Sequence, residues 1–352
     1  MLKKGTMNEL TDRQKFLLAL VVHEYARTAA PVGSVYLVGH YHLDMSSATV
    51  RNELAALTEQ GYLRQPHTSA GRVPTDEGYR YFVGRLLPET DLPEAMRHTI
   101  SHQFYQMRHD VDQWMRLAGS ILAHQSRAAS LVTAPHPETL RFKHLELIST
   151  RGRQVLMVLV LFGGDVRQRL LTLSEPVTQE QLSTSADRLT RALSDKNVES
   201  MLSQRAQFNG LDLNMLDWMI DDIRQARSVA GEVYLDGLTN VLAEPEFSGS
   251  DEARRALRLL EEGPLLQDLL ARTVLSANAS GVQVLIGGEG TFDELRQTSL
   301  ILTRYGAPGL ATGTLGVLGP MRLPYGRTIS TMRFLSSLLS DLVTETMIED
   351  EK

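Results

Sequence analysis

Residues 45–74 read MSSATVRNELAALTEQGYLRQPHTSAGRVP, and this stretch decides how the first part of the chain folds. Ser46 stands at an N-cap position, because its hydroxyl can accept a backbone N–H of the first helical turn. Gly61 stands where a helix often ends with a residue in the left-handed conformation. Three apolar residues between them have the i, i+4, i+7 spacing of one buried stripe: Val50, Leu54 and Leu57. The stretch therefore predicts a helix that packs through one face.

The opposite face of this helix is small and polar. It carries Ala48, Asn52 and Ala55, flanked by Thr49 and Arg51. A helix that enters the major groove of DNA needs short side chains for close approach and donors such as Arg and Asn that reach base edges. An ordinary solvated helix surface has a similar composition, so this face alone leaves both interpretations open.

The neighbouring residues favour a nucleic-acid partner. Gln65 to Val73 is a polar, small-residue run that predicts a two-stranded hairpin, and Leu37 to Leu43 predicts a short helix upstream. Helix, turn, helix and hairpin in this order are the parts of a winged helix-turn-helix. Base edges and phosphates would be contacted by nine residues, which are Ser46, Ser47, Thr49, Arg51, Asn52, His67, Thr68, Ser69 and Arg72.

Three runs in this region carry a family resemblance. They are PVGS at residues 31–34, SSATVRNEL at 46–54 and PHTSAGRVPT at 66–75, and they resemble HrcA, a family of bacterial heat-inducible transcription repressors. Weaker similarity continues through four further runs, which are YLDG at 234–237, PEF at 245–247, VLIG at 284–287 and GVLGP at 316–320. One departure is Val35, which follows Ser34 where family members often carry a basic residue.

The resemblance implies an α+β protein with an N-terminal winged helix-turn-helix and a GAF-like α+β domain that contains an inserted helical and β dimerisation module. It also implies a homodimeric repressor of heat-shock chaperone operons. Such a repressor binds double-stranded DNA at an inverted repeat, the CIRCE operator, and its activity is modulated by the GroEL chaperonin. The resemblance implies no enzyme activity and no cofactor.

Composition sets broader limits. A chain of 352 residues exceeds what one hydrophobic core usually serves, so two or three domains are expected. The absence of cysteine excludes disulfides, thiolate catalysis and cysteine-ligated zinc. No apolar run is long enough to span a membrane and no signal-peptide pattern is present, so we expect a cytoplasmic protein without membrane contact. The net charge is −6, but residues 1–85 hold ten Lys/Arg against eight Asp/Glu, or +2, which leaves −8 for the remainder.

Helical patterns flank the central stretch. Thr11 caps a helix whose inward residues are predicted to be Phe16, Leu17, Leu20 and Val21. Thr75 opens another helix, Gly78 to Leu87, whose aromatic residues are predicted to close the core and could alternatively form a stacking platform for bases.

A long helix is predicted from Glu94 to Ser130. Its apolar residues follow a 3.5-residue repeat: Ile100, Phe104, Met107, Val111, Trp114, Ala118 and Ile121. Such a seam needs a partner helix. The pattern leaves open whether the seam packs within its own chain or lies at a dimer interface.

The second half of the chain alternates strand and helix patterns. Strands are predicted at 142–149, 155–162, 166–173, 282–286, 299–304 and 313–318, and the run 155–162 is apolar enough to be buried on both faces. One sheet begun before residue 175 and finished after 282 indicates an α+β domain with an insertion. The predicted division is 1–87 for the DNA-binding domain, 88–195 for the linker, long helix and first GAF-like part, 196–270 for the inserted dimerisation module, and 271–352 for the second GAF-like part.

Other chemistry finds little support. His98 and His102 share a helix face, but neither has a third ligand at metal-binding spacing. The glycine-rich runs near 287–290 and 306–319 match no phosphate-binding motif. No nucleophile and base are arranged for catalysis. The alternative to a repressor is a small-molecule-sensing GAF-like regulator whose winged helix mediates protein contacts.

Overall fold

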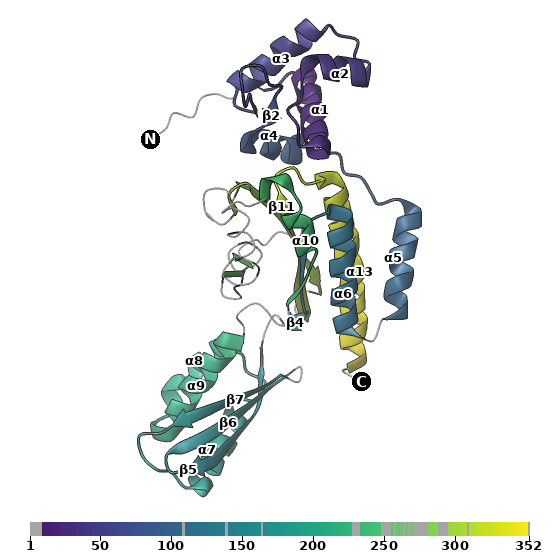
Figure 1. The fold of residues 1–352 in the computed structure, drawn as a ribbon. Helices are drawn as coiled ribbons and strands as arrows, with labels where there is room; N and C mark the ends of the chain where they lie inside the picture. The colour runs from purple at the N-terminus through teal and green to yellow at the C-terminus, as the bar shows by residue number, and fades with distance from the viewer. Residues whose placement is uncertain are drawn as a thin grey trace.

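The computed structural model describes residues 9–107, 110–137, 140–162, 165–226, 233–247, 281–287, 295–307 and 310–350, with single positions between 255 and 273. Three parts follow one another along the molecule: a helical N-terminal unit, a central sheet covered by long helices, and a smaller sheet with helices of its own (Figure 1). The predicted turn at Gly163-Gly164 and most of the glycine-rich run at 287–290 lie outside the described residues.

The N-terminal unit contains the helices and the hairpin that the sequence predicts. Its elements are α1 (Asp12–Thr28), α2 (Ser34–Tyr41), α3 (Ser47–Glu59), β1 (Leu63–Arg64), β2 (Val73–Pro74), α4 (Asp76–Tyr81) and the π-helical turn η1 (Phe82–Leu86). The Ser46 hydroxyl caps α3 by accepting the Thr49 N–H at 3.1 Å. Gly61 follows the helix with a φ of 85°. The predicted stripe of Val50, Leu54 and Leu57 is buried.

Two predictions about the core of this unit differ in outcome. Phe16, which was expected inside, is 47% exposed, whereas Leu18 and Val22 are buried. Leu17 and Val21, which are also expected inside, are buried, and Leu20 packs against the core, so only Phe16 departs from the prediction. Tyr79 is buried and Tyr81 packs against the same core, so these aromatic residues of α4 belong to the core.

The predicted helix from Glu94 to Ser130 is two helices, α5 (Glu94–Gln106) and α6 (Val111–Ser126). Asp110 starts α6, since its carboxylate accepts the Gln113 N–H at 3.1 Å. The Trp114 indole N–H donates to the Met107 carbonyl at 2.8 Å across the break. All seven residues of the predicted seam belong to the hydrophobic core or pack against it, so the seam packs within its own chain.

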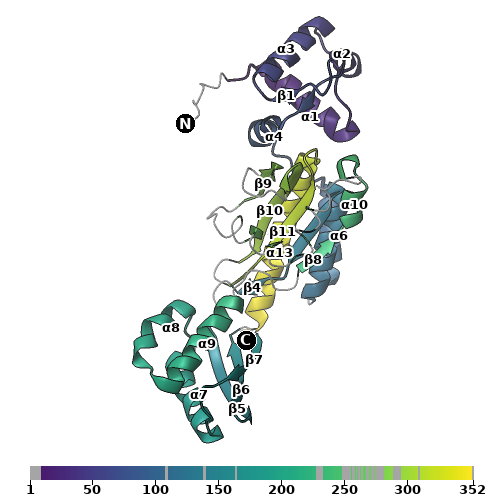
Figure 2. The ribbon, with the colours of Figure 1, turned by 60° about the vertical axis from the view of Figure 1, so that its left-hand side comes forward.

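The central sheet has the strand order β8-β3-β11-β10-β9, with each neighbouring pair antiparallel, and β4 (His136–Pro137) also pairs with β11. Its strands are β3 (Ala129–Thr133), β8 (Val233–Asp236), β9 (Gln283–Ile286), β10 (Thr298–Gly306) and β11 (Ala311–Pro320). Helices α6 and α13 (Tyr325–Asp350) pack side by side against this sheet (Figure 2). Every residue of β11 is buried, which means that both faces of the sheet are covered. The short α10 (Leu238–Leu242) and η3 (Pro245–Phe247) lie near the N-terminal unit.

The remaining strands form a second sheet, β5-β6-β7, which is antiparallel throughout. Its elements are β5 (Phe142–Arg151), β6 (Gln154–Leu161), β7 (Val166–Thr172), α7 (Gln179–Leu193), α8 (Val198–Gln204), the single 3-10 turn η2 (Arg205–Gln207) and α9 (Gly210–Ala226). These elements enclose a hydrophobic cluster separate from that of the central sheet.

The prediction of one sheet shared by 142–173 and 282–318 is therefore wrong. The prediction that 155–162 is buried on both faces is also wrong, because β6 alternates buried and partly exposed residues. Helices α7 and α9 cover only one face of this sheet, so the side chains that alternate along β6 have different environments. Strand β3 of the central sheet begins at Ala129, inside the stretch that was predicted to end the long helix at Ser130. That helix ends earlier, at Arg127, which has a φ of 53°.

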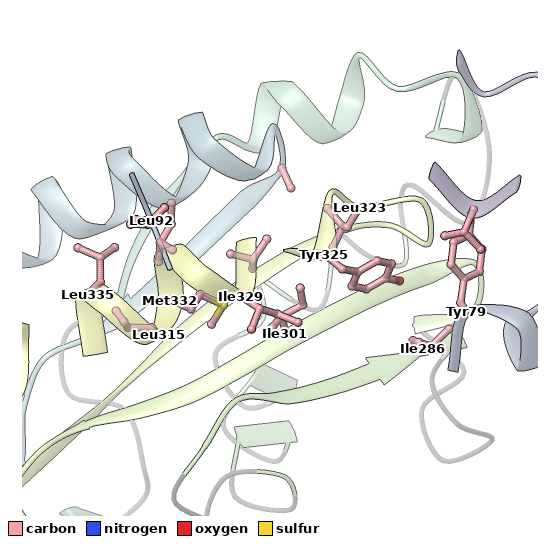
Figure 3. Packing of buried hydrophobic residues seen from close by; sticks show 14 of the residues in the cluster. Tyr79, Leu92, Ile286, Ile301, Leu315, Leu323, Tyr325, Ile329, Met332 and Leu335 are labelled. Atoms are coloured by element: carbon pink, nitrogen blue, oxygen red, sulfur yellow. The ribbon is translucent and has the colours of Figure 1, made fainter. Parts of the chain in front are cut away.

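The N-terminal unit is docked on the central sheet. The rings of Tyr79 in α4 and Tyr325 in α13 lie 6.0 Å apart at this junction (Figure 3). Arg80 donates to the Ile286 carbonyl of β9 at 3.1 Å. Arg322, which precedes α13, donates to the Ala26 carbonyl of α1 at 3.4 Å and forms ion pairs with Glu244 and Glu246. Aromatic packing and these polar contacts together fix the orientation of the unit.

Replacing Gly71 with alanine tests how the hairpin is attached. A Cβ at Gly71 would lie 2.4 Å from the backbone of Val32, next to the bridge in which Arg72 and Val32 exchange backbone hydrogen bonds. We expect Gly71→Ala to lower the free energy of unfolding by about 1–3 kcal/mol.

The matched control is Gly39→Ala, where a Cβ meets no atom within 4 Å and lies inside α2. This change should be neutral or should stabilise by about 0.5–1 kcal/mol, as expected for alanine in a helix interior. Urea unfolding of both variants measures the difference, and equal stabilities would contradict the close contact.

Candidate nucleic-acid interface

The outward face of α3 is free of protein contacts at its centre. Arg51 and Asn52 are exposed, and Thr49 is half-buried at the first turn. The hydroxyls of Ser46 and Thr49 lie 2.9 Å apart and bond to each other, so both take part in the cap. Ser47 is half-buried beside them. The residues that the sequence predicts to read base edges are therefore accessible to a partner outside the chain.

The tip of the hairpin is held in shape by Gln65, which is not among the predicted site residues. The amide of Gln65 donates to the carbonyls of Thr68 and Ala70, at 2.8 and 2.9 Å. The Ala70 N–H donates to the His67 carbonyl at 2.8 Å. His67, Thr68 and Ser69 are exposed on this ordered turn. Their hydroxyl and imidazole groups point away from the core on a fixed backbone.

Arg72 has a different position from the other predicted residues. It is half-buried, and its Nε donates to the Thr58 hydroxyl of α3 at 2.9 Å. The side chain therefore links the hairpin to the helix while the rest of its guanidinium can still contact an anion. Arg72 therefore positions the hairpin in addition to any contact that it makes with phosphate.

A groove of about 420 Å³ lies between the start of α2, α3 and the hairpin. It brings together four of the nine predicted residues, which are Arg51, Thr68, Ser69 and Arg72. Ser46, Ser47, Thr49, Asn52 and His67 do not line it. Gly33, Ser34, Val35 and Gln65 also line the groove and were absent from the prediction. The run PVGS at residues 31–34, just before α2, is the local signal that could have pointed to Gly33 and Ser34.

A buried carboxylate holds α2 in place beside this groove. Glu24 of α1 is 2% exposed and accepts hydrogen bonds from Arg27 at 2.8 Å, Tyr36 at 2.9 Å and Tyr41 at 2.6 Å. The hydrogen bond from Arg27, with those from Tyr41 and Tyr36, outweighs the effect of burial and lowers the pKa of Glu24 to about 2. Because Tyr36 and Tyr41 belong to α2, this network fixes the angle between α1 and α2.

Among the residues that the structure describes, no group of three or more His, Asp or Glu side chains is arranged to hold a metal ion. Within the same residues, no helix is long and apolar enough to cross a membrane. The site is thus a surface with donors and hydroxyls on a rigid helix and hairpin.

Glu24→Gln tests the network through the pH dependence of stability. A carboxylate whose pKa is lowered on folding stabilises the protein above its unfolded-state pKa, and this contribution disappears as the pH falls through the folded value. We expect the wild type to exceed Glu24→Gln by about 1–2 kcal/mol near neutral pH, since the exposed Arg27 is screened by solvent.

The difference should shrink between about pH 4.5 and pH 2, the range that the lowered pKa of Glu24 defines. Thermal unfolding at several pH values measures it. Glu59→Gln is the control, because Glu59 is exposed and has no hydrogen bond or ion pair with the described residues. A pH-independent difference for Glu24→Gln would argue against the network.

Comparison with known proteins agrees with these observations. Residues 112–329 match the family model described as HrcA protein C terminal domain. The heat-inducible transcription repressor HrcA of Roseiflexus sp. (strain RS-1) is 45% identical over 346 residues, which cover 96% of this chain and 95% of the relative. The protein of the same name from Chloroflexus aurantiacus is 43% identical over 354 residues, covering 96% and 94%.

A solved structure described as a hypothetical protein shares the fold. It has a TM-score of 0.58 and 22% sequence identity, and the match covers 96% of this chain and 98% of that one. The family model covers more than half of the chain, and the relatives match it almost from end to end. On these grounds the chain belongs to the HrcA family.

Proposed function

We propose that this protein is a sequence-specific, DNA-binding transcription repressor and that residues 9–87 form a winged helix-turn-helix. The observation that carries the proposal is the exposed face of α3 with Arg51 and Asn52, where Arg51 also lines the groove between the start of α2, α3 and the ordered hairpin. The relatives that are named heat-inducible transcription repressors support it. A repressor of this kind needs no catalytic residue, and it acts in the cytoplasm, where bacterial DNA lies.

In this proposal α3 enters the major groove, and one set of residues contacts the bases while another contacts the phosphates. Arg51 and Asn52 contact base edges, which distinguish one base pair from another. Ser46, Ser47 and Thr49 lie at the N-terminus of α3, where backbone N–H groups and hydroxyls suit a phosphate. His67, Thr68, Ser69 and Arg72 contact the backbone from the hairpin.

The molecule offers a surface that can pair two copies. On the outer face of the second sheet, six apolar side chains lie on adjacent strands: Ile148, Leu156, Val158, Val160, Val166 and Leu170. Ile148 lies opposite Leu156, which lies opposite Leu170, so they form a continuous row. The helices of this part cover the other face. Glu146 and Gln168 lie opposite Val158 on the same face, so polar groups border the apolar residues. An exposed apolar patch with a polar rim is typical of a protein–protein interface.

We therefore place the inserted dimerisation module at about residues 140–226, in place of the expected 196–270. The central sheet with α6 and α13 is the GAF-like domain of the proposal. Dimerisation far from the N-terminal unit leaves both copies of α3 available for one DNA duplex. Two-fold symmetry matches an inverted repeat, such as the CIRCE operator, whose half-sites would be one or more helical turns of ~34 Å apart.

Regulation by the GroEL chaperonin fits the same proposal. The row of exposed apolar residues on the second sheet is a surface that a chaperonin can bind when the dimer is not formed. Chaperonin that promotes assembly would raise the concentration of the DNA-binding dimer. Unfolded proteins that occupy the chaperonin would then relieve repression of the chaperone operons.

Arg51→Ala tests the reading of bases by α3. We expect the affinity for an inverted-repeat duplex to fall by about 1–3 kcal/mol, with a smaller change for scrambled DNA. Arg72→Ala should weaken binding to both duplexes almost equally. Titrations at several salt concentrations measure the two effects.

Arg97→Ala is the control, because Arg97 is exposed on α5 far from the groove. Full operator affinity in Arg51→Ala would refute the assignment of Arg51. If the wild type shows no preference for the inverted repeat, the N-terminal unit serves protein contacts instead, and the repressor proposal fails.

Leu170→Asp tests the dimer surface. Leu170 is 57% exposed at the β7 end of the row that it forms with Leu156 and Ile148, so a charge there should stay solvated in the monomer and should disfavour pairing. We expect light scattering to show a monomer and operator affinity to fall. Leu202→Asp is the control in the same module, on α8 and 38% exposed. An intact dimer in Leu170→Asp would place the interface elsewhere.

A further inference from the structure

The N-terminal end of α2 offers free backbone donors. Helices α2 and α3 lie side by side at the end of the molecule farthest from the second sheet (Figure 1). Gly33 precedes α2 and supplies no side-chain cap, and the first turn contains no acidic residue. The first backbone hydrogen bond of the helix runs from the Leu37 N–H to the Gly33 carbonyl at 3.0 Å. Among the described residues none accepts a bond from the N–H groups of residues 34–36, which remain available to a partner outside the chain.

A second, independent feature lies at the same place. Ser34, the first residue of α2, is 8% exposed and lines the groove between α2, α3 and the hairpin. Its hydroxyl forms no hydrogen bond with the residues that the structure describes, although buried polar groups nearly always have a partner. The oxygen is open to the groove, since the described side-chain atoms that are both unpartnered and fully enclosed belong to Tyr79 and Gln125. The Ser34 hydroxyl is thus free to bind a group that enters the groove.

The charges around the groove favour an anion. Arg51 and Arg72 line it, and no Asp or Glu is among the described residues that do so. Arg51 is exposed and forms no ion pair within the described part of the chain. Only the Nε of Arg72 donates to Thr58, so its other guanidinium N–H groups can face the groove. Backbone N–H groups at a helix start, a hydroxyl and guanidinium groups together suit an oxyanion with several acceptor oxygens.

These donors are held in place before any partner binds. Tyr36, in the first turn of α2, donates to the buried Glu24 at 2.9 Å. Val32 and Arg72 exchange backbone hydrogen bonds of 2.9 and 2.8 Å, which connect the segment before α2 to the hairpin. A preorganised site loses little conformational entropy on binding, so each of its hydrogen bonds contributes more to affinity.

We propose that the start of α2 binds a phosphate of the DNA backbone, with the Ser34 hydroxyl and the N–H groups of residues 34–36 as donors. The inference rests on the proposed repressor function and adds a contact that the nine predicted residues do not include. Because Arg51 of α3 lines the same groove, the bound phosphate borders the major groove that α3 enters. Phosphate contacts carry no sequence information, so this one fixes the position and angle of α3 on the duplex.

Ser34→Ala tests the site in the full-length protein. We expect its affinity for the inverted-repeat duplex and for scrambled DNA to fall by a similar factor, about tenfold, because a hydrogen bond to a charged group is lost. Its Tm should be equal to or above that of the wild type, since alanine is favourable in a helix. Ser120→Ala is the matched control, because Ser120 is exposed on α6 and does not line the groove. It should bind DNA as the wild type does.

Neutral methylphosphonate linkages then locate the contact. Each phosphate of the inverted-repeat duplex is replaced in turn, and the wild type and Ser34→Ala are titrated with every duplex. At one phosphate per half-site, the replacement should weaken the wild type about tenfold more than it weakens Ser34→Ala, because the variant has already lost that interaction. An effect of Ser34→Ala that acts through the fold would instead show the same factor at every phosphate.

Three results would overturn the inference. Ser34→Ala could bind DNA with full affinity, or its loss could be the same at every phosphate. Inorganic phosphate alone could bind at submillimolar concentration and fail to bind Ser34→Ala, which would identify a site for a free anion. In all three results the wild type still prefers the inverted repeat, so the repressor function stands. A wild type without that preference would contradict the proposed function, and this inference with it.

Discussion

One hydrophobic cluster connects the candidate DNA-binding surface to the rest of the molecule. It runs from the inner face of α3 through Tyr79 to Tyr325 and along α13 and the central sheet. Burial of apolar surface is the main stabilising term of a domain, and a cluster without interruption makes the two parts cooperate in folding. The N-terminal unit is thus not a module on a flexible tether. Its orientation depends on the contacts at the junction with the central sheet.

Polar contacts give this junction its specific geometry. Arg322 is mostly buried and connects α1, the segment around Glu246 and the start of α13. Such a charge is stable only where its partners are correctly placed, because an unpaired buried charge is strongly unfavourable. The apolar cluster therefore holds the parts together, while Arg322 and Arg80 select one arrangement.

The two ends of the molecule have complementary roles in this architecture. The outward face of α3 is small and polar, and it carries the donors Arg51 and Asn52. The outer face of the second sheet carries an exposed apolar row of Ile148, Leu156 and Leu170, which is the pairing surface of the proposal. Between them, the central sheet with α6 and α13 acts as a rigid connection. The distance and angle between two α3 helices in a dimer would be fixed through this connection.

Much of the local structure could be predicted from the sequence. The cap at Ser46, the turn at Gly61 and the stripe of Val50 are short-range signals, because they depend on residues within one or two helical turns. The same holds for strands β9, β10 and β11 and for the candidate residues Arg51 and Asn52. Arg51 and Asn52 are exposed because the buried stripe of Val50, Leu54 and Leu57 occupies the opposite face of the helix.

The tertiary structure alone decided which elements share a core. An apolar strand such as β6 has the same composition whether one face or both are buried, so its membership in a separate sheet was not visible in the pattern. The break at Met107 was also missed, since the apolar repeat runs from Ile100 and Phe104 into α6 without interruption, whereas the Asp110 cap and the bond from Trp114 to Met107 separate the two helices. The network around Glu24 and the groove between α2, α3 and the hairpin join residues that are far apart in sequence. The sequence by itself determined the local elements and their exposed faces, whereas long-range packing decided how those faces meet, because burial is a property of the assembled chain.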